Sequence, residues 1–159
     1  MPISHRTALL GLSLAAGLAL SPLAVSHFND KEILQSYRQS WFAMVATNFG
    51  PMVAMLKGDM PWDEQRLAEN AKQLVQLTEM DISRGFSPGS EKGTTRAKPG
   101  IWENRDDFNS KMADLKEAAA ALQTAVAGGD RKTISQAIAA TGDTCSACHD
   151  EYQAEEYLY

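Results

Sequence analysis

The stretch ISQAIAATGDTCSACHDEY, residues 134–152, carries the pattern that decides the fold. Its apolar and small side chains recur at spacings of 4, 3, 4, 3 and 4 residues, which is typical of the buried seam of a helix in a bundle. Asp130 is suited to cap the start of this helix. We therefore predict a helix over residues 130–155. Its seam consists of Ile134, Ile138, Thr141, Cys145, Cys148 and Tyr152.

Three further stretches show the same helical period. They cover residues 31–57, 63–82 and 104–127. A kink is expected at Gly50-Pro51, because proline removes a backbone hydrogen bond and clashes with the preceding turn. Residues 83–100 form the one long connection, which either covers something at one end of the molecule or is a flexible linker. The prediction is an all-α fold, an antiparallel four-helix bundle.

Charge and composition exclude several classes of function. The 159 residues include 15 Lys and Arg against 20 Asp and Glu, a net charge of −5. A nucleic-acid-binding protein needs a basic face, and binding to an anionic membrane surface needs basic clusters. We therefore expect neither as a partner. The two cysteines are too few for a disulfide-dense scaffold.

The first segment, residues 1–26, is typical of a signal peptide. A short basic start precedes an apolar run of 13 residues from Ala8 to Leu20, and a small-x-small pattern ends at Ser26. A membrane span needs about 20 apolar residues, so an uncleaved membrane anchor is the weaker alternative. We predict cleavage after Ser26, a mature domain over residues 27–159, and no membrane association after cleavage.

The five residues Cys145-Ser146-Ala147-Cys148-His149 form the attachment pattern of a c-type haem. Cys145 and Cys148 are three residues apart on one helical face, so both thiols can add to the vinyl groups of one haem. His149 can then direct an imidazole nitrogen to the iron. The cysteines lie on the predicted seam, so the sequence predicts one covalent haem c per chain, held between helices. Because c-type haem is attached outside the cytoplasm, we expect a bacterial periplasmic location.

Other uses of the two cysteines fit the sequence less well. A thioredoxin-like CxxC begins a helix that follows a strand, whereas this motif lies some 15 residues inside a predicted helix. A structural zinc site needs four ligands, and residues 27–159 add only His27 to the motif. A disulfide between helical positions i and i+3 has poor geometry. These comparisons favour haem.

Several short motifs occur in an order that resembles one known family. The first half of the chain contributes Tyr37-Arg38-Gln39-Ser40, Phe49-Gly50-x-Met52 and Lys57-Gly58-x-x-Pro61-Trp62-Asp63. The second half contributes Phe86-x-Pro88-Gly89, Lys98-Pro99-x-Ile101-Trp102, Phe108 and Cys145-x-Ala147-Cys148-His149-Asp150-x-Tyr152. Together they cover essentially all of the mature chain and resemble cytochrome c prime.

This resemblance implies a periplasmic four-helix-bundle haem protein that is usually a homodimer. It implies a five-coordinate, high-spin iron that binds nitric oxide and carbon monoxide, with a role in nitric oxide tolerance or electron transfer rather than in catalysis. The redox partner is unknown. The resemblance assigns Cys145 and Cys148 to the thioether bonds and His149 to the iron. It assigns Arg38 and Gln39 to haem contact.

Phe42 corresponds to the position that lies over the vacant face of the iron in this family. Related low-spin bundle cytochromes have a ligating methionine there, whereas a phenyl ring has no donor atom. Met44 lies about 200° further around the helix and should not reach the iron. Arg38 shares the face of Phe42 and can pair with a haem propionate. The alternative is a six-coordinate, low-spin electron-transfer cytochrome of the same fold, with another methionine as ligand.

Two positions depart from the family pattern. Gln153 stands where many members have a basic residue, one helical turn after His149, and it should face the proximal side of the haem. Arg96, in the long loop, either neutralises a propionate or is a solvated charge. A peroxidase would need a distal acid–base residue such as histidine, and the stretch around Phe42 has none, so we expect no enzymatic activity.

Overall fold

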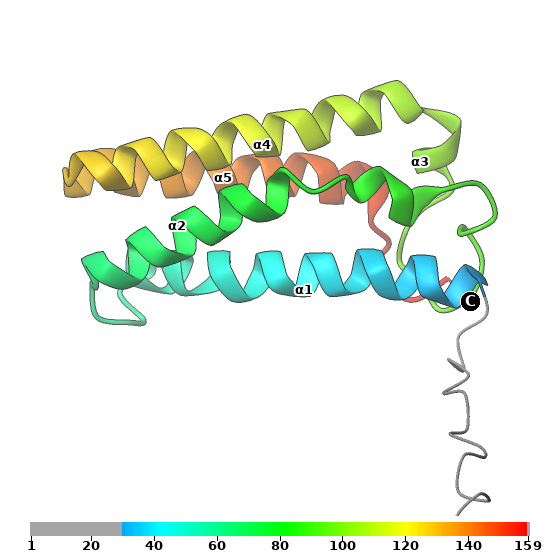
Figure 1. Cartoon of the computed structure of the whole chain (residues 1–159), viewed down its shortest axis with the longest axis horizontal. Coiled ribbons are helices and arrows are strands. Elements are labelled where there is room, and N and C mark those ends of the chain that lie inside the picture. The colour runs from blue at the N-terminus through cyan, green and yellow to red at the C-terminus, as the bar shows by residue number, and fades with distance from the viewer. Residues whose placement is uncertain (1–29, 159) are drawn as a thin grey trace, which may run out of the picture.

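The computed structural model describes residues 30–158 (Figure 1). The predicted signal peptide, its cleavage site and His27 lie outside these residues. In the described part, the chain forms long helices, and one of the connections between them is a long irregular segment. The elements are α1 (Asp30–Lys57), α2 (Glu64–Thr78), the short 3-10 helix η1 (Ile82–Phe86), α3 (Gly100–Glu103), α4 (Arg105–Gly128) and α5 (Arg131–Tyr152).

The four long helices form an antiparallel bundle, as predicted (Figure 1). α1 packs on α2, α2 on α4, and α4 on α5, and α1 and α5 make a smaller contact that closes the cycle. Local caps explain the helix starts: Asp63 accepts a hydrogen bond from the Arg66 amide, and Asp130 accepts one from the Thr133 amide. No helix of residues 30–158 is long and apolar enough to span a membrane.

The helix predicted over residues 63–82 is shorter in the structure. α2 ends at Thr78, and a separate turn, η1, begins at Ile82. The Asp81 side chain accepts a hydrogen bond from the Ser83 amide and thereby caps this new turn. Ile82 remains buried, at 6% exposure, so the apolar period continues across the break in the helix. α1, by contrast, continues through Pro51 to Lys57 as one helix.

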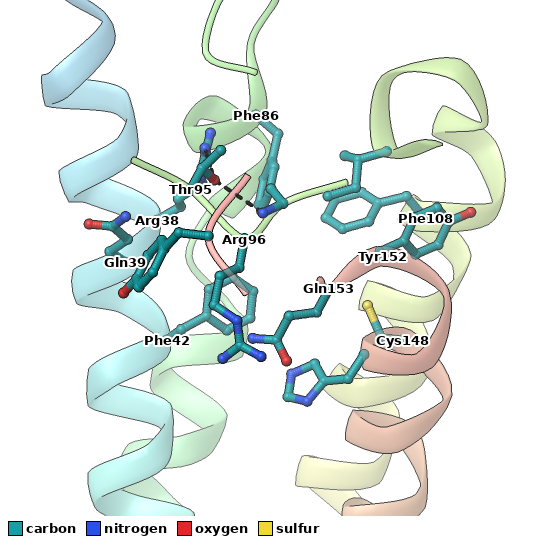
Figure 2. A pocket seen from close by; sticks show the side chains of 14 residues that line it. Arg38, Gln39, Phe42, Phe86, Thr95, Arg96, Phe108, Cys148, Tyr152 and Gln153 are labelled. Carbon is teal, nitrogen blue, oxygen red and sulfur yellow. Dashed lines mark hydrogen bonds between the residues drawn. The ribbon is translucent and has the colours of Figure 1, made fainter. Parts of the chain in front are cut away.

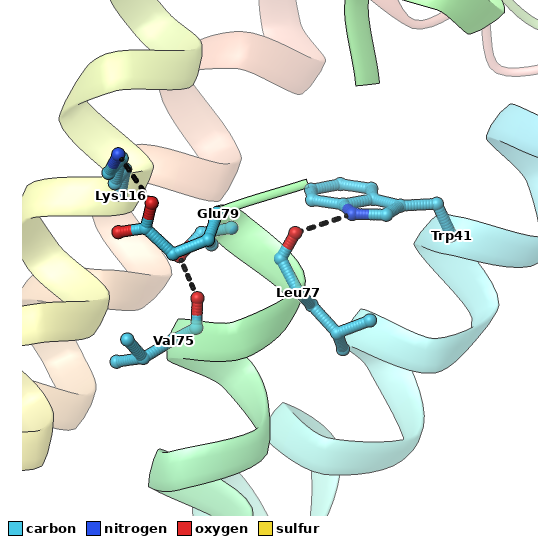
Figure 3. A network of polar contacts seen from close by, with 6 residues as sticks. Trp41, Val75, Leu77, Glu79 and Lys116 are labelled. Atoms are coloured by element: carbon cyan, nitrogen blue, oxygen red, sulfur yellow. Dashed lines mark hydrogen bonds and ion pairs between the residues drawn. The ribbon is translucent and has the colours of Figure 1, made fainter. Parts of the chain in front are cut away.

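The end of α2 is fixed to both neighbouring helices (Figure 3). The indole nitrogen of the fully buried Trp41, on α1, donates a 2.8 Å hydrogen bond to the Leu77 carbonyl. On the other side, the ammonium of Lys116 on α4 pairs with the Glu79 carboxylate at 2.9 Å. These contacts hold the start of the irregular segment, residues 79–99, at a defined place beside α1.

The irregular segment packs on α1, which favours the covering role over a flexible linker. η1 lies so close to α1 that a Cβ on Gly85 would approach the Arg38 Cβ to 2.8 Å. Only glycine permits this contact without displacement. The Tyr37 hydroxyl also donates to the Asp81 carbonyl at 3.0 Å. The segment therefore covers the end of the bundle where α1 begins.

The last helix ends earlier than predicted, at Tyr152 rather than at residue 155. Gln153 has an extended backbone, and the residues after it pair with the irregular segment. The Ala154 amide donates to the Arg96 carbonyl at 2.8 Å, and the Leu158 amide donates to the Thr95 carbonyl at 2.9 Å. We call residues 153–158 the C-terminal tail. Its pairing partners replace the backbone hydrogen bonds that a longer helix would have made.

Candidate functional site

A cavity of about 350 Å³ lies between α1, the irregular segment and the end of α5. All the candidate site residues except Cys145 line it. Figure 2 shows the α1 side chains on one side and those of α5 on the other. The lining residues are Arg38, Gln39, Phe42, Phe86, Thr95, Arg96, Ala97, Ile101, Phe108, Cys148, His149, Tyr152, Gln153 and Tyr157.

The α5 wall carries the cysteines and the histidine of the CSACH motif. Cys148 and His149 line the cavity, and Cys145, one turn earlier, is half-buried against the core. The two cysteines form no disulfide. Burial raises the pKa of both thiols, so neither resembles the low-pKa thiolate of a redox-active CxxC.

The α1 wall carries Phe42, held by its aromatic neighbours. Its ring stands edge-on to the buried Trp41 ring, with centroids 4.8 Å apart and planes at 86°. On the cavity side, the Phe42 ring faces the ring of Phe86 on η1, with centroids 6.4 Å apart. Because Trp41 is itself hydrogen-bonded to α2, this edge-on stacking holds the phenyl ring in place. Phe42 therefore forms an apolar wall opposite Cys148 (Figure 2).

Arg38 is turned toward the irregular segment. Its guanidinium donates to the Gly85 and Ser90 carbonyls, each at 2.9 Å, and to the Thr95 hydroxyl at 2.7 Å. It also lies over the Phe86 ring, 5.2 Å from the centroid. Burial lowers the pKa of Arg38 to about 10, although nearby Glu91 opposes this. Its donors thus fasten the irregular segment to α1.

Arg96 and Gln153 lie together on the tail side of the cavity (Figure 2). The Arg96 Nε donates a 2.6 Å hydrogen bond to the Ala154 carbonyl. Desolvation and the positive charge of Arg96 lower the pKa of His149, against the opposing effect of Asp150. Gln153 lines the cavity, and it does so from an extended backbone rather than from a helical turn.

Several lining residues were not among the predicted site residues. Tyr152 is 3% exposed, donates to the Asp107 carboxylate at 2.5 Å and stands edge-on to Phe108. This hydrogen bond raises the pKa of Tyr152 to about 12. The seam of residues 134–152 already included Tyr152, so its inward direction was predictable. Thr95 and Tyr157 had no such signal, because they line the cavity only through the pairing of distant segments.

The residues present fit a c-type haem. The cavity volume falls within the range of about 300–1,000 Å³ that is usual for ligand pockets. One wall offers a thiol and an imidazole from the attachment motif, and aromatic rings supply apolar surface for a macrocycle. The cavity also contains two guanidinium groups, which suit the carboxylates of haem. No three His, Cys, Asp or Glu side chains within residues 30–158 are grouped as ligands for a metal ion alone.

Comparisons with known proteins agree with this fit. The family model described as Cytochrome C' matches residues 34–153. The cytochrome c' of Cereibacter sphaeroides is 37% identical over 146 residues, which cover 89% of this chain and 96% of the relative.

Solved structures extend the comparison to the fold. Cytochrome c prime from Shewanella frigidimarina has a TM-score of 0.76 and 40% identity, and covers 81% of this chain and 100% of its own. A nitric oxide complex of a cytochrome c prime variant from Alcaligenes xylosoxidans has a TM-score of 0.72 and 31% identity, over 82% of this chain and 100% of its own. With its four-helix bundle and its CSACH motif on the cavity wall, the chain belongs to the cytochrome c' family and is a protein with covalently bound c-type haem.

Proposed function

We propose that this protein is a periplasmic haem protein that binds nitric oxide and carbon monoxide at a five-coordinate, high-spin iron and exchanges electrons with a redox partner. In this proposal Cys145 and Cys148 form the thioether bonds, and His149 is the axial ligand. When bound, haem would supply an iron atom that can take a diatomic gas. The observation that carries the proposal is the phenyl ring of Phe42 on the wall opposite Cys148.

The composition of the cavity wall supports a single protein ligand. No methionine lines the cavity among the described residues. Met52 and Met55 are buried in the core, at 0% and 2% exposure, and Met44 is 41% exposed. A sixth ligand from one of these three methionines would therefore require a different arrangement of α1. The six-coordinate alternative remains the outcome that the spectrum tests.

The polar side chains of α1 near Phe42 are already engaged, which supports a preference for nitric oxide and carbon monoxide over dioxygen. The Gln39 amide nitrogen donates to the Thr94 carbonyl at 3.0 Å, and the Arg38 donors are directed to the irregular segment. The α1 side chains would therefore give a ligand bound next to Phe42 little hydrogen bonding, which disfavours dioxygen relative to nitric oxide and carbon monoxide. The α1 wall also has no histidine for peroxidase-type acid–base chemistry.

We also propose that residues 1–26 direct export and are removed after Ser26, and that the mature protein is a homodimer. Two exposed apolar side chains on α1, Ile33 and Met44, support the dimer. They are 11 residues apart, which is about three helical turns, so they share one face. Sedimentation at several protein concentrations tests the dimer, and mass spectrometry of protein exported to the periplasm tests cleavage.

The ferric absorption spectrum, recorded with and without nitric oxide, tests the proposed function. We expect a long-wavelength charge-transfer band of high-spin haem and a spectral change when nitric oxide or carbon monoxide is added to the reduced protein. A methionine-to-iron band in the oxidised protein, or no response to either gas, would refute the proposal.

A further inference from the structure

Two arginines line the cavity, and they differ in how their donors are used. The Arg38 guanidinium is 2% exposed, and both of its terminal nitrogens donate to groups of the irregular segment. It lies between the rings of Phe86 and Trp102, 5.2 and 5.8 Å from their centroids. These contacts leave Arg38 little freedom to turn toward a ligand.

Arg96 is only partly buried and has a simpler set of contacts. Among residues 30–158, its side chain donates one hydrogen bond, from Nε to the Ala154 carbonyl. The two terminal nitrogens donate none to the described residues. Figure 2 shows the side chain of Arg96 directed into the cavity beside Gln153. Arg96 thus offers the planar pair of donors that binds a carboxylate best.

The C-terminal tail aims Arg96 into the cavity. The Ala154 amide donates to the Arg96 carbonyl while the Ala154 carbonyl accepts from Arg96 Nε. On either side, the Lys98 amide donates to the Tyr152 carbonyl and the Leu158 amide to the Thr95 carbonyl, each at 2.9 Å. These contacts hold both the backbone and the Nε of Arg96 in one place.

Among residues 30–158, no Asp or Glu lines the cavity beside this cation. The charge of Arg38, by contrast, is partly balanced by nearby Glu91. A haem brings carboxylates into the cavity at the edge of its macrocycle. We propose that Arg96, held by the C-terminal tail, binds a haem propionate, while Arg38 fastens the irregular segment to α1.

This inference rests on the proposed haem site, and variants of the holoprotein test it. In Arg96→Gln, we expect the propionate-bending band in the resonance Raman spectrum to shift and the reduction potential to fall, because a positive charge next to the haem is lost. Arg96→Lys should restore much of the potential. Lys98→Gln is the matched control: it removes the same charge from the same loop, but Lys98 donates to the Asp150 carbonyl outside the cavity lining.

The outcomes separate this inference from the proposed function. If Arg96→Gln changes neither the Raman band nor the potential, or changes them only as much as Lys98→Gln does, Arg96 does not hold the propionate. If the conservative variant Arg38→Lys shifts the propionate band while Arg96→Gln leaves it in place, the two roles are reversed and the inference is wrong. Carbon monoxide binding by the unaltered protein would still support the proposed function in either case.

Discussion

The ring of Phe42 on α1 stands edge-on to the ring of Phe86 on η1, with centroids 6.4 Å apart and planes at 76°. These two residues are 44 positions apart in sequence, and they meet because Arg38 and Trp41 fix the irregular segment and the end of α2 against α1. The apolar wall of the cavity is therefore a product of tertiary packing as well as of the residue type at position 42.

Replacing Phe42 with methionine should add a second axial donor. We expect Phe42→Met to shift the ferric spectrum toward low spin and to weaken carbon monoxide binding, because the gas must displace a thioether. Absorption spectra and carbon monoxide titration measure both effects. Phe42→Leu is the control, since it keeps an apolar side chain without a donor and should remain high-spin. Unchanged spectra and affinity in Phe42→Met would mean that Phe42 does not lie over the iron.

Removing the buried guanidinium of Arg38 should destabilise the fold. Arg38→Met would leave the Gly85 and Ser90 carbonyls and the Thr95 hydroxyl without their donor, and we expect a loss of about 3 kcal/mol in the free energy of unfolding. Urea unfolding measures it. Arg96→Gln, which changes one partly exposed side chain, should cost less than about 1 kcal/mol. Equal losses in the two variants would contradict the structural role of Arg38.

Gly85 should tolerate no side chain. In Gly85→Ala the added Cβ would meet the Arg38 Cβ at 2.8 Å and the Tyr37 ring at 3.1 Å. We expect η1 to move away from α1, with a loss of about 2 kcal/mol in unfolding free energy and faster carbon monoxide association as Phe86 withdraws from Phe42. Gly128→Ala, where a Cβ meets nothing within 4 Å, is the control. Wild-type stability and kinetics in Gly85→Ala would show that the contact is not tight.

The Tyr152 hydroxyl should make stability depend on alkaline pH. Its hydrogen bond to Asp107 raises the pKa of Tyr152 to about 12 in the folded state, above the value of about 10 expected when unfolded. The contribution is therefore complete below about pH 10 and is lost as the pH rises toward 12. Urea unfolding between these values should show stability falling more steeply in the wild type than in Tyr152→Phe. Parallel profiles for the two proteins would contradict this linkage.

Tyr157 should slow the entry of ligands. It lines the cavity although it is 63% exposed, and the tail that carries it is paired to the irregular segment at Thr95. We expect Tyr157→Ala to speed carbon monoxide association in flash photolysis, with little effect on stability. Tyr157→Phe should behave like the wild type, because the ring rather than the hydroxyl occupies the space. Identical rates in the alanine variant would remove Tyr157 from the entry path.

Much of the fold could be predicted from periodicity alone. The seam from Ile134 to Tyr152 placed the attachment motif on the inner side of the last helix. The predicted starts of two helices, at Asp63 and Asp130, lie one residue before the starts in the structure. Both are local patterns in which spacing and capping chemistry act within a few residues. The break at residues 79–81 was not predicted, because the apolar period continues across it to Ile82.

The roles of the polar cavity residues were harder to predict. The sequence favours Arg38 as the partner of a propionate, since it lies one helical turn from Phe42, but its donors are taken by acceptors of the irregular segment. For Arg96 the sequence leaves two alternatives, a propionate partner or a solvated charge, because the direction of its side chain depends on the Ala154 carbonyl, 58 residues away. Similarly, residues 153–155 were predicted as helix because their alternative backbone partners belong to a distant segment.

The two sides of the cavity come from opposite ends of the described chain, Phe42 from α1 and Cys148 from α5. In the proposed function, the residues that join haem to the protein fall, by contrast, within five consecutive positions. We therefore expect haem attachment to be a local event that an incompletely folded chain can undergo, whereas control over which gas reaches the metal would require the finished tertiary structure. A red colour in a variant shows that attachment has succeeded, and it says nothing about whether the wall above the metal has formed.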